Sequence, residues 1–462
     1  MMDIPPEKLE ICLDILQQIS EDPAIIAQNE RFKGLIAKIH KQGRKIARIN
    51  EQKNRDIEDI KIKKSTLIVQ KQIADSLVDN LPKSAGELPQ FNTPVTCYIC
   101  KQNYTQIHFF YHLLCPKCAE FNYQKRYQRT NLNGRIALVT GGRIKIGYQM
   151  VLRLLQDGAR VIVTTRFPRN CAYRYSLEPD FYQWRDRLQI YGLDLRNISA
   201  VEAFVNHLLQ TESALDILIN NAAQTIKRPL EFYQHLLEEE QKPLETLTET
   251  AKALIPYCQN QQTFLLETQP QYREHLPVLE GNYFPAKTFD IDGQQLDTRP
   301  MNSWLLKLDR VSTIELLEVH LVNAIAPFIL NSKLKQLMIK SSCDRRFIIN
   351  VSAMEGQFNR DHKTPNHPHT NMAKAALNMM TRTAAIDYAR DGIFMNSVDT
   401  GWITDENPYP KKMHLQTQRN FYTPLDIIDG MARIYDPIIQ GIETLDRPIF
   451  GYFLKDYLPY PW

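Results

Sequence analysis

The segment from Gly134 to Leu155 constrains the fold of this 462-residue chain more than any other feature. It begins with GRIALVT, a short run rich in β-forming residues, continues with the glycine-rich GGRIKIG, and ends with YQMVLRLL, which has the apolar spacing of a helix. Glycines let a backbone approach a phosphate closely, and the free N–H groups of a helix N-terminus attract it. The segment therefore predicts a strand, a phosphate-binding turn and a helix in an α/β fold.

The rest of the chain from Asn131 onward agrees with this prediction, because strand and helix patterns alternate as a doubly wound parallel sheet requires. The alternation breaks once, at about residues 225–311, where the sequence is polar and rich in Gln, Glu and Thr. We interpret this stretch as an insertion of helices and loops that forms a lid or an interface. Its aromatic residues either cap a pocket or pack a small core of their own: Tyr272, Tyr283, Phe284 and Trp304.

Two smaller regions precede the α/β domain, which we place at residues 131–462. Residues 1–92 are rich in Lys, Glu, Ile and Gln, and their apolar residues recur at helical spacing, with Gly43 interrupting. We expect a helical arm of two to four helices, arranged as a hairpin or a coiled coil. The stretch LPKSAG at residues 81–86 is predicted to be a linker. Residues 93–130 hold two pairs of cysteines.

The paired cysteines have the spacing of a zinc ribbon. Two C-x2-C pairs, Cys97 with Cys100 and Cys115 with Cys118, are separated by fourteen residues. Each pair places two thiolates on one tight turn, and two such turns complete a tetrahedral shell around zinc. Four protein ligands leave no open position, so the predicted Zn2+ is structural. The alternative is four unrelated buried thiols. We expect the ribbon to brace the arm against the α/β domain.

Further motifs follow the glycine-rich turn in a fixed order. Asp194 lies in YGLDL, residues 220–222 read NNA, and Asn323 lies in VNA. Together with the TGGRIKIG turn these motifs resemble those of the short-chain dehydrogenase/reductase family, over roughly residues 132–462 and interrupted by the insertion. The resemblance implies a Rossmann domain that binds NAD or NADP.

The same resemblance implies which residues contact the cofactor. They are Thr140, Gly141, Gly142, Arg143, Ile146, Gly147, Arg166, Asp194, Leu195, Asn221, Ala222, Lys374 and Thr404. The family's middle glycine in the turn is Lys145 in this chain. Either Lys145 or Arg143 contacts a phosphate, or the lysine is solvated and the turn is slightly reshaped.

The end of the second strand indicates which cofactor is preferred. In the family, an acidic residue there accepts the adenosine ribose hydroxyls and favours NAD. This chain has Thr165 and Arg166 instead, and an arginine suits a 2′-phosphate. We therefore expect NADP(H), with NAD(H) as the alternative if Arg166 is an ordinary exposed charge.

The catalytic positions match the family only in part. The family uses a Tyr acid, a Lys four residues later, a Ser and an Asn. Lys374 and Asn323 match, and Lys374 would hold the nicotinamide ribose while Asn323 orders a water. Thr370 stands where the Tyr is expected and Ala353 where the Ser is expected, while Ser352 should face the other side of the strand.

A Thr hydroxyl is a poor proton donor at neutral pH because its pKa is far above that of Tyr. His362, His367 and His369 lie close to Lys374 in sequence, and one of them could supply the proton. The alternative is that they are ordinary loop residues. The candidate catalytic residues are Asn323, Lys374, Thr370 and His369.

Two hypotheses for function follow. The first is an NAD(P)-dependent oxidoreductase with an atypical active site that acts on a small-molecule carbonyl or alcohol. The second is a catalytically inactive NAD(P)-binding scaffold, a pseudoenzyme, that binds a protein partner through the arm, ribbon and insertion. A third and weaker hypothesis is nucleic-acid binding through the ribbon and the basic arm, for which a net charge of +4 alone does not argue. Homo-oligomers stay open. With no secretory signal and no apolar stretch of about 18 residues, we expect a soluble, cytoplasmic protein.

Overall fold

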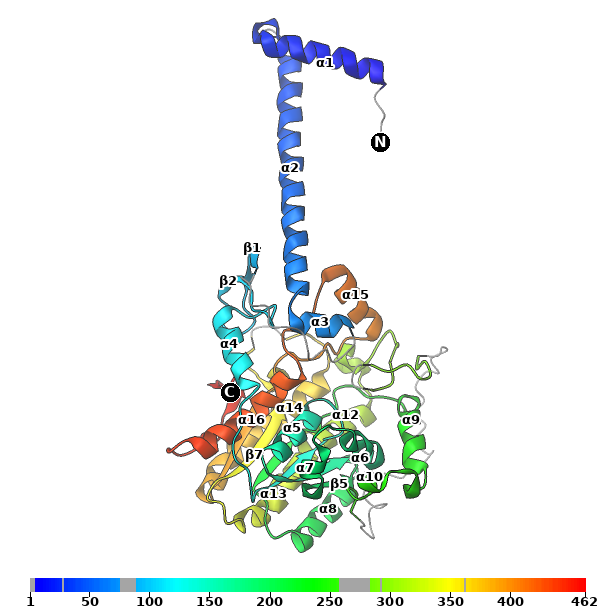
Figure 1. Ribbon diagram of the computed structural model, residues 1–462, viewed down its shortest axis with the longest axis vertical. Coiled ribbons are helices and arrows are strands. Elements are labelled where there is room, and N and C mark those ends of the chain that lie inside the picture. The colour runs from blue at the N-terminus through cyan, green and yellow to red at the C-terminus, as the bar shows by residue number, and fades with distance from the viewer. Residues whose placement is uncertain (1–4, 27–28, 75–88, 257–282, 291–292, 361–362) are drawn as a thin grey trace.

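The computed structural model describes residues 5–26, 29–74, 89–256, 283–290, 293–360 and 363–462. A sheet with helices on both faces forms the body of the molecule, and a long helix projects from it (Figure 1). The predicted linker at residues 81–86, and the side chains of Tyr272 and His362, lie outside the described residues.

The central sheet has eight strands in the order β10-β9-β8-β7-β6-β3-β4-β5. All neighbours are parallel except the edge strand β10, which runs antiparallel to β9. The order changes direction at β3, so the crevice above the carboxyl ends of β3 and β6 is where this architecture binds ligands. This confirms the predicted doubly wound Rossmann fold. The strands are β3 Ile136–Thr140, β4 Arg160–Thr165, β5 Leu188–Gly192, β6 Ile217–Asn220, β7 Arg346–Ser352, β8 Ile393–Asp399, β9 Phe453–Lys455 and β10 Leu458–Tyr460.

Two apolar layers sandwich the sheet, because successive strand residues face opposite sides. In β3, Ala137 and Val139 join one layer and Leu138 joins the other. The first layer is covered by α5 (Lys145–Gln156), α6 (Pro168–Ser176) and α16 (Ile427–Glu443). The second is covered by α8 (Ile198–Thr211), α13 (Ala326–Ile339) and α14 (Pro368–Arg390).

A chain of buried polar side chains crosses the second layer. The Asn220 amide donates to the Oδ1 atoms of Asn331 (2.7 Å) and Asn350 (2.8 Å). Asn350 donates in turn to Thr381 Oγ1 (2.8 Å), which also accepts from the Ser397 hydroxyl (2.8 Å). This chain joins strands β6, β7 and β8 to helices α13 and α14. Since these hydrogen bonds form in one alignment of the elements, the network fixes their register.

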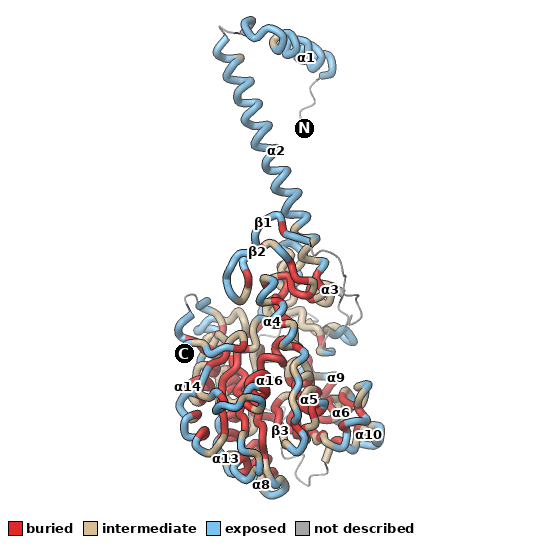
Figure 2. Tube along the Cα trace, turned by 60° about the vertical axis from the view of Figure 1, so that its left-hand side comes forward, coloured by how far each residue is buried: buried red, intermediate tan, exposed pale blue. Residues whose placement is uncertain are grey.

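The N-terminal arm consists of α1 (Pro6–Glu21), α2 (Glu30–Lys64) and α3 (Leu67–Ala74). Helix α2 stands away from the body, and α1 and most of α2 are exposed (Figures 1 and 2). The predicted interruption at Gly43 is wrong, because α2 continues through it. A glycine inside an exposed helix costs only about 1 kcal/mol, which a helix of 35 residues tolerates.

The ribbon, with β1 (Gln90–Thr96), β2 (Asn103–Gln106) and α4 (Pro116–Lys125), lies between the arm and the body. Ile68 of α3, Phe110 and Tyr111 of the ribbon, and Leu425 before α16 share one buried apolar cluster. The cluster therefore connects all three regions.

Ion pairs reinforce this contact. The buried guanidinium of Arg126 donates to the carboxylates of Asp426 (2.6 Å) and Asp429 (2.8 Å) at the start of α16. The Tyr111 hydroxyl also donates to Asp429 (2.5 Å). Arg126 and Tyr111 thus compensate the two buried carboxylates. Without such partners, burial of their charges would be costly.

The insertion covers the loop between β4 and α6. Its first helix, α9 (Leu230–Gln241), brings the Glu240 carboxylate to the start of α6, where it accepts from the backbone N–H groups of Arg169 (3.0 Å) and Asn170 (3.1 Å). The carboxylate thus caps that helix N-terminus. The remaining elements are η1 Pro23–Ile26, α7 Phe181–Trp184, η2 Arg185–Arg187, η3 Leu244–Thr246, α10 Glu249–Lys252, η5 Ser303–Leu305, η6 Leu308–Arg310, α12 Thr313–His320, η7 Leu321–Ile325, η8 Met354–Gly356 and α15 Tyr409–Arg419.

One helical stretch of the described chain, Thr313–Ile339, is long and apolar enough to cross a membrane by length and composition, although the sequence analysis expected none. It is the run of α12, η7 and α13, and 44% of its most apolar window is buried. Leu330 and Leu334 of this stretch are fully buried in the second layer. The stretch is therefore a core helix of the α/β body, whose apolar side faces the sheet.

Candidate nucleotide-binding and active site

A cavity of about 1060 Å³ lies at the carboxyl ends of the sheet strands. Most of the predicted site residues line it: Gly141, Arg143, Ile146, Gly147, Arg166, Asp194, Leu195, Asn221, Ala222, Thr370, Lys374 and Thr404. Four predicted residues are not among the lining residues: Thr140, Gly142, Asn323 and His369. The glycine-rich turn and the Lys374 helix, far apart in sequence, thus share one cavity.

The glycine-rich turn is closed by the NNA motif behind it. The Asn221 amide donates to the carbonyl oxygens of Thr140 (3.0 Å) and Gly141 (3.1 Å), and the Ala222 N–H donates to Thr140 Oγ1 (3.0 Å). A Cβ on Gly147 would lie 2.2 Å from the Gly141 oxygen and 2.4 Å from Asn221 Nδ2. Only glycine fits at position 147. Thr140 and Gly147 therefore shape the turn through their contacts with neighbouring protein atoms.

Lys145, the residue in place of the family's middle glycine, begins α5 with φ 56°. This is the left-handed region, which glycine adopts freely and a lysine does not. The turn therefore keeps the backbone shape of the motif although its sequence departs from it. Arg143 is nearly buried and donates to Asn170 Oδ1 (3.0 Å), which ties it to α6. Burial lowers the pKa of Arg143 to about 10.

The predicted Arg166 lines the cavity at the end of β4. Its guanidinium lies over the rings of Tyr233 (4.6 Å to the centroid) and Phe167 (5.3 Å), so a helix of the insertion helps to hold it. The Asp194 carboxylate accepts from the Arg196 backbone N–H (2.9 Å) and guanidinium (2.6 Å). Burial opposes ionisation of Asp194, but these hydrogen bonds and the charge of Arg196 keep its pKa below the usual value.

Lys374 lies on α14 with its ammonium buried at the cavity wall. Its Nζ donates to the Val351 carbonyl oxygen (2.8 Å), and burial lowers its pKa to about 8. One helical turn earlier, Thr370 also lines the cavity, and its buried hydroxyl has no hydrogen-bond partner within the described part of the chain. Ala353 and Ser352 both line the cavity, and the Ser352 hydroxyl donates to Asn378 (2.6 Å) on α14.

Asn323 is buried, and both polar ends of its side chain form hydrogen bonds with the same residue. Its Oδ1 accepts from the Gln224 N–H (2.7 Å) and its Nδ2 donates to the Gln224 carbonyl (3.0 Å). Both polar ends of the side chain thus hold the backbone that follows β6. Asn323 lies in the π-helical turn η7, a local irregularity that is frequent at functional sites.

His369 does not face the cavity. Its ring is 1% exposed, and Nε2 lies 3.4 Å from Glu315 on α12. Helix α14 presents Thr370 and Lys374 to the cavity, and the adjacent position points elsewhere because successive helical residues are rotated by about 100°. His367 does line the cavity, with its ring stacked on Trp304 at 3.7 Å, and burial lowers its pKa.

The structure also brings in residues that the sequence analysis missed. Tyr98, between the first two cysteines, lines the cavity, and its hydroxyl accepts from the Trp402 N–H (3.0 Å). Lys101 of the same turn lines it too, as does Asp399 at the end of β8. Only Asp399 carried a signal in the sequence, since an acidic residue at the carboxyl end of a parallel strand faces the ligand crevice.

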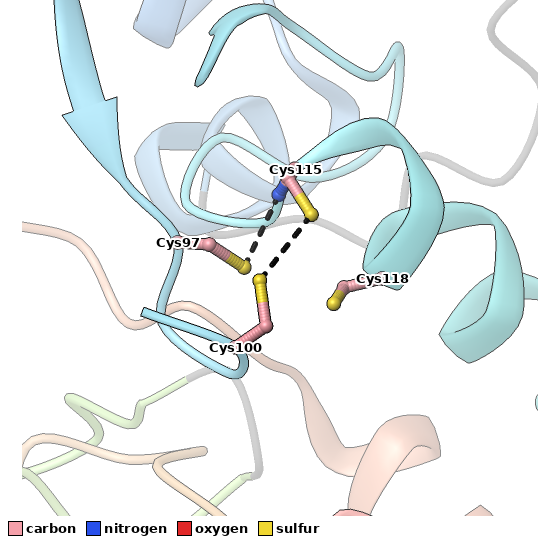
Figure 3. Close-up of side chains that lie close together, drawn as sticks. All are labelled: Cys97, Cys100, Cys115 and Cys118. Atoms are coloured by element: carbon pink, nitrogen blue, oxygen red, sulfur yellow. Dashed lines mark hydrogen bonds between the residues drawn. The ribbon is translucent and has the colours of Figure 1, made fainter. Parts of the chain in front are cut away.

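The four predicted metal ligands converge beside this cavity wall. The sulfurs of Cys97, Cys100, Cys115 and Cys118 all lie within 4.8 Å of one another, and those of Cys100 and Cys115 are 3.7 Å apart (Figure 3). A tetrahedral shell with Zn–S bonds of about 2.3 Å has sulfurs about 3.8 Å apart. The backbone N–H of Cys115 also donates to the sulfur of Cys97 (3.3 Å). The arrangement fits a zinc ribbon.

Comparison with known protein families settles which family this geometry represents. A family model described as short chain dehydrogenase matches residues 135–245, and one described as Enoyl-(Acyl carrier protein) reductase matches residues 306–420. The chain belongs to the short-chain dehydrogenase/reductase family. The gap between the two matched segments contains most of the insertion.

Individual relatives were also found. The chain is 34% identical over 354 residues to the uncharacterized protein R665 of Acanthamoeba polyphaga mimivirus, covering 74% of this chain and 71% of that one. It is 38% identical over 93 residues to the human dehydrogenase/reductase SDR family member 13, which is 20% of this chain and only 24% of the human protein.

The solved structures that match this chain include the NADPH-bound carbonyl reductase from chicken fatty liver, at 18% identity and a TM-score of 0.44, covering 72% of this chain and all of that one. Another is the Pseudomonas aeruginosa RhlG/NADP active-site complex, at 18% identity and a TM-score of 0.38, covering 63% of this chain and 78% of that one.

Proposed function

We propose that this chain is an oxidoreductase that uses NADP(H) to interconvert a small-molecule carbonyl and an alcohol. The observation that carries the proposal is the buried ammonium of Lys374 in the same cavity as the glycine-rich turn. A buried lysine held by one carbonyl oxygen still has two N–H donors, which suit the two hydroxyls of a nicotinamide ribose. The turn and the start of α5 offer N–H groups to the pyrophosphate.

The chemistry that NADPH supplies when bound is hydride transfer to the carbonyl carbon. This chain's own residues must then orient the carbonyl and deliver a proton to its oxygen. We expect the hydroxyl of Thr370, which has no partner among the described residues, to donate a hydrogen bond to that oxygen. The proton itself has to come from a more acidic group, because a Thr hydroxyl holds its proton too tightly.

Preference for NADP(H) over NAD(H) is supported by the end of β4. No acidic residue lies there to accept the ribose hydroxyls, and Arg166 is held over Tyr233 and Phe167 at the cavity. A guanidinium braced on two rings is a preorganised partner for a 2′-phosphate.

The test uses the full-length protein, NADPH and a panel of aldehydes and ketones, with turnover followed by nicotinamide absorbance. We expect reduction of at least one carbonyl, and a loss of about 100-fold or more in the Lys374→Ala variant. Lys340→Ala, which removes an exposed lysine at the end of α13, is the matched control and should keep wild-type turnover. Binding of NADPH without turnover of any carbonyl would contradict the proposal.

That last outcome would support the second candidate, a pseudoenzyme scaffold. Its specific support is that Thr370 and Ala353 replace the family's Tyr and Ser at the cavity. The exposed arm and the insertion would then bind a protein partner. This function predicts that NADP(H) raises the melting temperature of the protein without being consumed.

We also infer that the four cysteines hold one structural zinc ion, supported by sulfur spacing close to a tetrahedral shell. With four protein ligands the ion has no open position, so its role is to fold the ribbon. Thiols with metal spacing, rather than disulfides, also suit a reducing, cytoplasmic setting.

A further inference from the structure

We propose that Asp399 is the proton donor and acceptor of this active site, the role that a Tyr fills elsewhere in the family. The inference rests on the proposed oxidoreductase function and names the residue that completes it. Asp399 belongs to neither of the positions at which the family's Tyr and Ser are expected, so it would be an acid supplied from a different strand.

The sheet register places Asp399 next to the two altered positions. It is the last residue of β8, and its Cα pairs with that of Ser352 on β7, the residue immediately before Ala353. Paired residues of neighbouring strands lie about 4.8 Å apart. Asp399 also lines the same cavity as Thr370 and Lys374. Its carboxyl is therefore at the end of the cavity where the family's catalytic groups gather.

Asp399 also lacks the partner that a structural carboxylate would need. It is 6% exposed, yet no described residue donates a hydrogen bond to its carboxylate. Other acids around the cavity are held: Asp194 by Arg196, and Glu355 by Arg360. A buried carboxylate without a partner is costly, so its retention at the cavity wall points to a role with a ligand.

The charged and titratable groups that face Asp399 come from every element around it. They are Asp456 and Lys455 on the β9–β10 hairpin, Glu355 in η8, Arg433 on α16 and Tyr98 of the ribbon. Burial, then the two neighbouring acids, raise the pKa of Asp399 to about 6, against the opposing charges of Lys455 and Arg433. A carboxyl with such a pKa exchanges its proton near neutral pH, as a general acid must.

In the reducing direction, bound NADPH would supply a hydride to the carbonyl carbon and be oxidised to NADP+, and the carbonyl π bond would break toward oxygen. The Asp399 O–H bond breaks at the same time, and its proton forms the new O–H bond of the alcohol. Asp399 is left as a carboxylate and regains a proton from water at the cavity mouth. In the oxidising direction, the carboxylate accepts the alcohol proton. NADPH is the only reductant that the step needs.

A binding experiment tests the placement of Asp399 without any substrate. Oxidised nicotinamide carries a positive charge, so an ionised carboxylate beside it favours NADP+ over NADPH. We expect the affinity of the full-length protein for NADP+, relative to NADPH, to rise about threefold or more between about pH 5 and about pH 8. The rise should disappear in Asp399→Asn and persist in Asp405→Asn, which removes another carboxylate from the same cavity. An equal rise in wild type and Asp399→Asn would overturn the proposal.

A turnover experiment tests its catalytic role. Asp399→Asn should lower kcat about 100-fold or more while the NADPH affinity stays within a few-fold of wild type, and Asp399→Glu should restore part of kcat. If Asp399→Asn keeps the kcat of the wild type, the assignment of Asp399 is overturned and the oxidoreductase function is not. Absence of turnover in the wild type, across the whole carbonyl panel, would instead overturn the oxidoreductase function and Asp399's part in it.

Discussion

Replacing Asp399 by asparagine should make the protein more stable, and more so as the pH rises. The substitution keeps the size of the side chain and removes its charge. In the folded protein, burial first and then nearby acids raise the pKa of this carboxyl to about 6, against a usual value of 3.8. The folded state therefore resists ionisation of Asp399 more than the unfolded chain does.

The sign and size of the effect follow from this difference in pKa. Below the unfolded value of 3.8 the carboxyl is protonated in both states and costs nothing. As the pH rises, ionisation favours the unfolded chain, and above about pH 6 the cost levels off. A difference of about two pKa units corresponds to about 3 kcal/mol at most. Between about pH 5 and about pH 8 the cost grows by about 1.4 kcal/mol.

The assay is urea unfolding of wild type and Asp399→Asn at these two pH values. The free energy of unfolding of the variant minus that of the wild type should increase by about 1.4 kcal/mol from the lower to the higher pH. Taking the difference cancels groups that titrate equally in both proteins. Asp405→Asn is the control, because it shows any change in the free energy of unfolding that follows from loss of a carboxylate at the cavity in general. A difference that stays constant with pH would refute the argument that Asp399 is desolvated and unpartnered.

Three further outcomes are expected. Lys145→Gly should raise the free energy of unfolding by about 1 kcal/mol, because the backbone there is left-handed; unfolding curves that show a loss would contradict this. Arg166→Gln should weaken NADPH binding about tenfold or more and leave NADH binding nearly unchanged, as calorimetric titration would show; equal losses for both cofactors would exclude a 2′-phosphate contact. Cys115→Ser should abolish stoichiometric zinc, measured by elemental analysis, and lower the melting temperature; a full complement of zinc in this variant would remove Cys115 from the ligand set.

Local motifs were the part of the site that sequence could predict. The turn from Thr140 to Gly147 and the NNA motif depend on residue types that few backbones accept, since a Cβ on Gly147 would collide with Gly141 and Asn221. The four cysteines were predictable for a similar reason, because their ligand spacing is itself the structural requirement. In the structure, hydrogen bonds join the turn to the NNA motif, and the four cysteines converge in a cluster of their own.

Side-chain orientations and contacts between residues that are far apart in the sequence were not predictable in the same way. His369 is close to Lys374 in sequence, but the rotation of α14 turns its ring toward Glu315. Tyr98 enters the cavity only because the ribbon packs against the loop that follows β8, and no local pattern encodes that contact. The sequence shows that Asp399 is an acidic residue at the end of a strand. Its lack of a hydrogen-bond partner was not predictable, because the side chains around it come from four other elements.

The projecting arm fixes a distance between two parts of the molecule. Helix α2 has 35 residues, and at about 1.5 Å per residue its two ends are about 52 Å apart, farther than the width of a small domain. A partner bound to α1 is therefore held at the far end of a rigid helix (Figure 1). It does not contact the ribbon unless the partner itself is about as wide as α2 is long. A partner bound at α1 thus does not block ligands that enter or leave through the cavity mouth. The chain can be anchored by α1 while its cavity stays accessible.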